Sequence, residues 1–125
     1  MAPNLTREHN KKMIKTIFIN DKNKWRYNCV KYARTLVPNL PYGLWTIEDK
    51  KKIINDKKSK IGSVAIMNVG LPWGHVGVVV DKSHDGQLKT IREANYKLGK
   101  ITERTGTSAE LKILGYFNPT KHKDY

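Results

Sequence analysis

The only cysteine of this 125-residue chain lies in the stretch YNCVKYAR, residues 27–34, which has the pattern of a helix start. Asn28 is a favourable N-cap, and apolar residues recur at helical spacing as far as Val37, where Pro38 ends the helix. A helix N-terminus carries partial positive charge and unpaired N–H groups, and both favour a thiolate over a thiol. The position of Cys29 therefore indicates a reactive thiol. The alternative is a structural cysteine that packs as a small hydrophobic residue.

The sequence downstream of this helix has the pattern of β-strands. Short apolar runs separated by turn residues predict strands over residues 63–69, 75–81, 88–96, 100–105 and 113–118. Upstream of them, Thr46 and Asp49 have the spacing of a capping box and predict a helix from there through about residue 57, with its lysines on a solvated face. Helices first and an antiparallel sheet afterwards indicate an α+β fold.

The first residues of the chain predict one more helix. Residues 6–19 are basic and place Met13, Ile14, Ile17 and Phe18 on one face at helical spacing. A packing helix with a solvated lysine face is one interpretation, and a helix that disturbs membranes is the other. We expect residues 1–24 to form this basic helix and a loop, residues 25–119 to form the main domain and residues 120–125 to form a tail.

The composition restricts the class of protein. A net charge of +13 is concentrated in residues 1–60, which hold 15 Lys or Arg against 5 Asp or Glu. Such a field favours polyanions, including nucleic acid, anionic membrane surfaces and acidic envelope polymers. One cysteine excludes an internal disulfide. The chain has no apolar stretch of about 18 residues that could span a membrane, and residues 1–10 lack the apolar core of a secretory signal.

Three further residues have the chemistry that a cysteine nucleophile needs. His75 begins the strand expected over 75–81 and could exchange a proton with the thiol. Glu93 and Asn95 are two residues apart on the strand expected over 88–96, so they share one face and could orient the imidazole. An idle histidine at a strand edge and a solvent-exposed strand face are the alternatives.

These residues stand in motifs that resemble the CHAP domain (cysteine, histidine-dependent amidohydrolase/peptidase), a papain-like fold of cell-wall hydrolases. The motifs are NCVKYAR at 28–34, GSVAI at 62–66, GHVGVV at 74–79, EANY at 93–96 and GYFNP at 115–119. The resemblance implies a papain-like α+β fold with N-terminal helices packed on an antiparallel sheet.

The resemblance also implies roles for the candidate residues. Cys29 would be the nucleophile, His75 the general base, and Glu93 and Asn95 the groups that orient and charge-stabilise the imidazole. The backbone N–H of Cys29 would form the oxyanion hole, helped by Asn28, although an N-cap role explains Asn28 equally well.

The sequence also contains candidate residues for substrate and metal binding. We expect Trp73, Tyr42 and Trp45 to line a substrate groove, with core packing as the alternative for each. We expect no cofactor and no metal, because only Asp21 and Asn23 stand before the cysteine as candidate calcium ligands, among lysines.

The resulting hypothesis is a monomeric peptidoglycan hydrolase of the phage-lysin type, acting as an endopeptidase or an N-acetylmuramoyl-L-alanine amidase. Its basic first half would bind anionic envelope polymers or membrane surfaces, with no specific nucleic acid partner. Without a signal peptide it would be made in the host cytoplasm and released to the wall by a pore protein, or be carried in a virion. The alternative is a non-catalytic module that binds cell wall or a polyanion such as nucleic acid.

Overall fold

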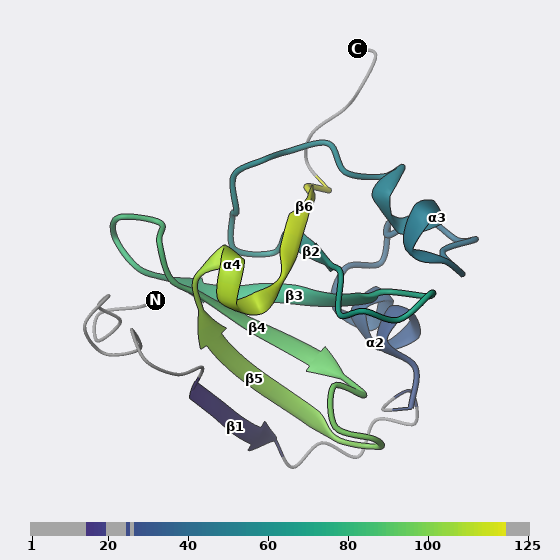
Figure 1. The fold of residues 1–125 in the computed structure, drawn as a ribbon, viewed down its shortest axis with the longest axis horizontal. Helices are drawn as coiled ribbons and strands as arrows, with labels where there is room; N and C mark the ends of the chain where they lie inside the picture. The colour runs from purple at the N-terminus through teal and green to yellow at the C-terminus, as the bar shows by residue number, and fades with distance from the viewer. Residues whose placement is uncertain (1–14, 20–24, 26, 120–125) are drawn as a thin grey trace.

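The centre of the molecule is a six-stranded antiparallel sheet, seen in a computed structural model that describes residues 15–19, 25 and 27–119 (Figure 1). The strand order is β1-β5-β4-β3-β2-β6, and every neighbouring pair is antiparallel. The strands are β1 (Lys15–Ile19), β2 (Val64–Met67), β3 (His75–Lys82), β4 (Lys89–Ala94), β5 (Ile101–Gly106) and β6 (Ile113–Phe117). The helices in the described part of the chain are α2 (Cys29–Leu36), α3 (Ile47–Lys51) and α4 (Ser108–Leu111). The predicted α+β class is confirmed.

Both faces of the sheet are covered, because alternate side chains of β2 enter different clusters. Val64 and Ile66 pack with Ala33 of α2, whereas Ala65 and Met67 pack in a second cluster with Leu111 of α4. Figure 1 shows α2 and α3 on the side of the molecule where β3 begins and β4 ends. The fold thus places the N-terminus of α2 beside the first residues of β3.

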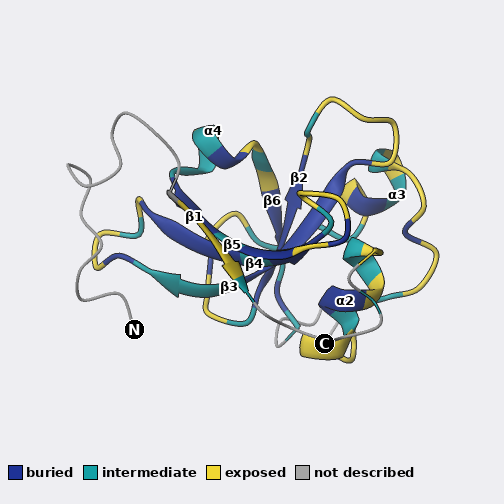
Figure 2. Ribbon diagram, turned by 90° about the horizontal axis from the view of Figure 1, so that it is seen from below, coloured by how far each residue is buried: buried dark blue, intermediate teal, exposed yellow. Residues whose placement is uncertain are grey.

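The predicted helix over residues 6–19 is wrong where the structure describes it. Residues 15–19 form β1, which pairs with β5 from Lys15↔Thr105 to Ile19↔Ile101. The sequence KTIFI is rich in β-branched and aromatic residues, which favour a strand once an edge is available for pairing. Figure 2 shows β1 mostly as exposed, in contrast to the buried strands beside it. Residues 6–14 lie outside the described residues.

The predicted helix from Thr46 begins as expected and ends early. The capping box is present, since Thr46 Oγ1 accepts from the N–H of Asp49 at 3.0 Å and Asp49 Oδ2 accepts from the N–H of Thr46 at 3.0 Å. The prediction that the helix continues to about residue 57 is wrong, because α3 ends at Lys51. Asn55 and Asp56 instead donate their backbone N–H groups to Tyr116 O of β6. Pairing along the edge of β6 therefore replaces the last predicted helical turns.

Candidate active site

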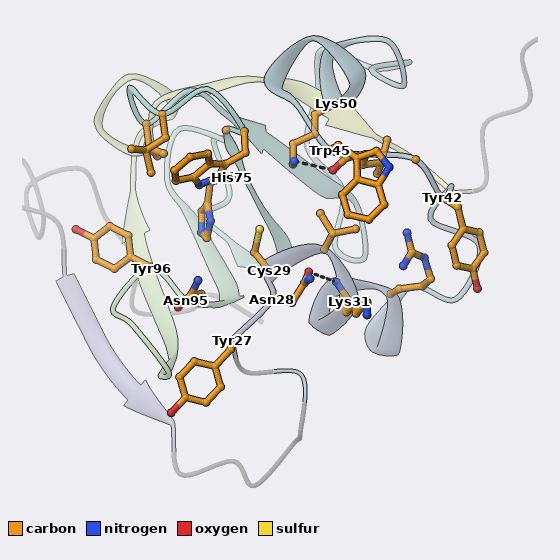
Figure 3. Close-up of a pocket in the computed structure, with 18 residues that line it drawn as sticks. Tyr27, Asn28, Cys29, Lys31, Tyr42, Trp45, Lys50, His75, Asn95 and Tyr96 are labelled. Atoms are coloured by element: carbon orange, nitrogen blue, oxygen red, sulfur yellow. Dashed lines mark hydrogen bonds between the residues drawn. The ribbon is translucent and has the colours of Figure 1, made fainter.

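A pocket of about 650 Å³ opens beside the N-terminus of α2. Its walls come from α2, the loop between α2 and α3, α3 itself, the loop before β3 and the turn after β4 (Figure 3). Most of the residues predicted from the sequence line it, namely Asn28, Cys29, Tyr42, Trp45, Trp73, His75 and Asn95. Glu93 lies behind His75 and is 1% exposed. Segments distant in sequence thus meet in one cavity.

Cys29 is the first residue of α2, as predicted. Its side chain is half-buried and lines the pocket together with His75. Burial raises the pKa of the Cys29 thiol, but the hydrogen bond and charge of His75 outweigh burial and lower the pKa below its ordinary value. The Val76 backbone and the charge of Lys50 make smaller contributions in the same direction. The site therefore favours the thiolate, which is the nucleophilic form.

His75 is the first residue of β3 and is buried between Cys29 and Glu93. Its Nε2 lies 2.8 Å from Glu93 Oε1, which leaves Nδ1 as the nitrogen available to Cys29. Burial lowers the pKa of His75, but the hydrogen bonds to Cys29 and Glu93, with the charges of both, raise it to about 9. The lowered pKa of the thiol and the raised pKa of the imidazole together favour a thiolate–imidazolium pair at neutral pH.

Glu93 is held by more partners than its role as an orienting group requires. Arg104 Nε donates to Glu93 Oε2 at 2.6 Å, and Arg104 Nη2 donates to Oε1 at 2.9 Å. Thr102 Oγ1 donates to Oε2 at 3.1 Å. Burial raises the pKa of Glu93, but hydrogen bonds and charges from His75 and Arg104 lower it below its ordinary value. Glu93 is therefore a fixed carboxylate that faces the imidazole.

Sequence reasoning missed Arg104 and Thr102. Both come from β5, whose register pairs Thr102 directly with Glu93 and brings Arg104 alongside. Arg104 is 3% exposed, and its guanidinium lies 3.7 Å from the ring centroid of Tyr96 at the pocket wall. The alternation in ITERT places Thr102 and Arg104 on one face of β5, which was the available signal.

Asn95 occupies a different position from the one predicted. It lies beyond the end of β4 with φ of 69°, so the expectation that it shares a strand face with Glu93 is wrong. Its Oδ1 accepts from the N–H of Gly99 at 3.1 Å and closes the turn that leads to β5. Asn tolerates this left-handed conformation better than most residues. Asn95 still lines the pocket, and its expected role toward the imidazole stays a prediction.

Asn28 has the capping role that the sequence predicted. Its Oδ1 accepts from the N–H of Lys31 at 3.0 Å, which fixes the start of α2 and with it the position of Cys29. Its expected contribution to an oxyanion hole stays a prediction.

The three aromatic residues expected at a substrate groove are exposed rather than packed in the core. Tyr42, Trp45 and Trp73 are 82%, 76% and 53% exposed, and all line the pocket. Figure 3 shows Trp45 and Tyr42 on the side of the pocket away from Tyr96. Exposed aromatic rings around a concave site are suited to contact with ligand, and core packing is excluded for these residues.

Lys50 also lines the pocket, although the sequence placed it on a solvated helix face. It is 2% exposed, and its ammonium donates to Leu44 O at 2.8 Å. Lys50 stands three residues after Ile47, whose side chain packs against the core, so helical spacing puts both on the inner face of α3. That spacing was the signal that could have identified it.

The arrangement can carry out nucleophilic attack on a carbonyl carbon followed by proton transfer through the imidazole. Among the residues that the structure describes, there is no group of three or more His, Cys, Asp or Glu side chains that could hold a metal ion. No helix in the same residues has the length and apolar character needed to cross a membrane.

Comparison with known protein families identifies one match. The family model described as "CHAP domain" matches residues 19–95, which include Cys29, His75 and Glu93. Neither the curated proteins nor the solved structures gave a significant match.

Proposed function

Because the chain belongs to the CHAP domain family, whose members are generally hydrolases, we propose that it is a peptidoglycan hydrolase that cleaves an amide bond by cysteine catalysis. The observation that carries this proposal is that Cys29, the first residue of α2, and His75, which is hydrogen-bonded to Glu93, line the same open pocket. A nucleophile at a helix start with its partners on strands supports a papain-like mechanism.

In the proposed reaction the thiolate of Cys29 attacks the carbonyl carbon of the scissile amide. The oxygen of the tetrahedral intermediate accepts from the backbone N–H of Cys29, since the first N–H groups of a helix lack intrahelical acceptors. His75 gives its Nδ1 proton to the leaving amine, the C–N bond breaks, and an acyl-enzyme remains. His75 then takes a proton from water, which attacks the acyl carbon; the acid and the Cys29 thiolate are released, and the thiolate–imidazolium pair is restored.

Glu93 contributes in two ways to this proposal. Its contact with Nε2 fixes the ring orientation and the tautomer that has Nδ1 toward the thiol. Its negative charge stabilises the imidazolium of the resting pair. Arg104 and Thr102 hold the carboxylate and are positioning residues rather than catalytic ones.

The test is digestion of purified peptidoglycan by wild-type protein and by Cys29→Ala, with mass analysis of the fragments. We expect turbidity to fall only with the wild type, and the new termini to identify the bond as a stem-peptide, cross-bridge or sugar–peptide amide. If neither protein digests walls of several chemotypes and both bind them, the hydrolase proposal is wrong. The chain would then be a non-catalytic module for cell wall or another polyanion.

We further propose that the enzyme acts as a phage lysin that reaches the wall from the cytoplasm through a pore protein, or from a virion. The excess of positive charge would hold it on the anionic envelope. Expression in a bacterium should leave the culture intact until the membrane is permeabilised with chloroform, and lysis should then follow for wild type and not for Cys29→Ala. Lysis without permeabilisation would contradict the need for a pore.

A further inference from the structure

Lys50 is a buried cation in the wall of the catalytic pocket. Its side chain approaches from α3 on the side of the pocket that also holds Cys29 and His75 (Figure 3). An ammonium has three N–H donors, and the bond to Leu44 O at 2.8 Å is the one hydrogen bond that Lys50 Nζ makes among the residues described. Donors therefore remain for a ligand, in a place where only 2% of the residue is exposed.

The neighbouring lysines, Lys51 at the end of α3 and Lys52 at its C-cap, differ from Lys50 in exposure, and Lys51 also differs in having a carboxylate partner. Lys51 and Lys52 are exposed, and Lys51 lies 3.4 Å from the carboxylate of Glu48. The carboxylate of Asp49, also adjacent in sequence, accepts from the backbone N–H groups of the capping box. The described structure thus gives Lys50 no carboxylate within salt-bridge distance, although a buried charge ordinarily requires one.

Apart from the Cys29 thiolate, the charged groups that line the pocket are positive. Lys31 and Arg34 line it together with Lys50, and no Asp or Glu is among its lining residues in the described part of the chain. Arg34 donates to Leu40 O and Pro41 O at 3.0 and 2.6 Å and stacks on Tyr42, so its guanidinium already has partners. Lys50 is therefore the buried pocket cation that is least satisfied by protein groups.

The ionisation of Lys50 responds to the negative charge at the reacting centre. Burial lowers the pKa of the Lys50 amine, while the charges of Cys29 and Asp49 raise it. An anion held in this pocket would stabilise the ammonium in the same direction.

We propose that Lys50 binds a carboxylate of the substrate beside the scissile bond, so that the enzyme selects peptides in which that carboxylate is free over peptides in which it is amidated. This specificity rests on the proposed amide hydrolysis, but the anion subsite itself does not. Lys50 then acts as a specificity-determining residue, separate from the Cys29–His75–Glu93 chemistry.

The first test uses two alkylating reagents of nearly equal shape. Iodoacetate and iodoacetamide both react with the Cys29 thiolate, which forms a C–S bond and expels iodide, but only iodoacetate has a carboxylate. We expect the ratio of the iodoacetate rate to the iodoacetamide rate to fall at least about fivefold in Lys50→Met. Lys52→Met removes the same charge from the exposed C-cap of α3 and should leave the ratio unchanged.

The ratio separates anion binding from thiolate activation. If Lys50 only lowers the pKa of Cys29, both reagents slow equally in Lys50→Met and the ratio stays constant, which would overturn the proposal. An equal fall of the ratio in Lys52→Met would also overturn it, because a general surface field would then explain the preference.

The second test requires only the wild-type protein, so it stands even if Lys50→Met does not fold. Stem peptides that differ only in a free or an amidated carboxylate next to the cleaved amide should differ at least about fivefold in kcat/KM, mainly through KM. Equal cleavage of the two peptides overturns the specificity. If no peptidoglycan peptide is cleaved while the alkylation ratio still depends on Lys50, the proposed hydrolysis fails and the anion subsite stands.

Discussion

Replacement of Arg104 by Met should destabilise the protein by about 3 kcal/mol or more, because it leaves Glu93 buried with one of its two counter-charges removed. The guanidinium makes two charge-assisted hydrogen bonds to the carboxylate, of 2.6 and 2.9 Å, at a site where the Arg104 and Glu93 side chains are 4% and 0% exposed. Removing one member of a buried pair costs about 3–5 kcal/mol. His75 and Thr102 still contact Glu93, so we expect the lower part of that range.

The chain contains a matched control for this change. Arg92 and Glu103 form an ion pair of 2.6 Å across the same two strands, but their side chains are 37% and 18% exposed. Arg92→Met should therefore cost about 1 kcal/mol or less, because water screens the partly exposed pair. The same residue type, the same substitution and the same strand pair are compared in two environments.

Urea denaturation followed by circular dichroism gives the free energy of unfolding of each variant by linear extrapolation. The double variant Glu93→Gln/Arg104→Met removes both charges and should be more stable than the sum of the single effects by about 2 kcal/mol. If Arg104→Met costs no more than Arg92→Met, or if the two single effects add, the buried pair does not support the site as we argue.

Three further predictions concern the same region. His75 has a folded pKa of about 9 and an unfolded pKa of about 6.5, so its contribution of up to about 3 kcal/mol to the free energy of unfolding should be present below about pH 6.5 and be lost as pH rises through 9. The unfolding free energies of wild type and His75→Gln should therefore converge at the alkaline end of this range. A constant difference between them would contradict the raised pKa. Gly77→Ala should cost about 1–3 kcal/mol and slow alkylation of Cys29, because the added methyl would overlap Ile91 Cγ2 and press on Glu93 Cβ; unchanged denaturation and alkylation would refute this close approach. Thr46→Ala should lower the unfolding free energy by about 1 kcal/mol through loss of the α3 cap. An unchanged unfolding free energy in urea denaturation would show that the capping box does not contribute to stability.

The parts of the site that the sequence predicted depend on short-range signals. Asn28 is an N-cap whatever surrounds it, so the helix start and the place of Cys29 were readable from the local sequence. His75 and Glu93 lie in β-branched runs bounded by turns, which identify strands without knowledge of the partners. The capping box formed by Thr107 and Glu110 has the same form as the capping box at Thr46, and its sequence pattern could have predicted α4.

The parts that were missed depend on pairing between distant segments. The register of β4 against β5 places Thr102 and Arg104 on Glu93, and nothing within either strand specifies that register. The left-handed backbone of Asn95 follows from the turn that it closes with Gly99, so alternation counted along the strand failed one residue past its end. The sequence predicts a uniformly solvated run of lysines, but α3 turns Lys50 toward the core.

The pairing of β1 with β5 affects how the chain can be shortened. The family match begins at residue 19, but β1 covers Lys15–Ile19 and hydrogen bonds along the strand that carries Thr102 and Arg104. A chain whose N-terminus is trimmed to residue 19, where the match begins, would leave the outer backbone donors and acceptors of β5 without β1. An open strand edge of this kind is a template for intermolecular pairing, so such a fragment would be prone to aggregate and would loosen the support of Glu93 at the same time. A minimal catalytic unit therefore has to start upstream of the recognisable domain.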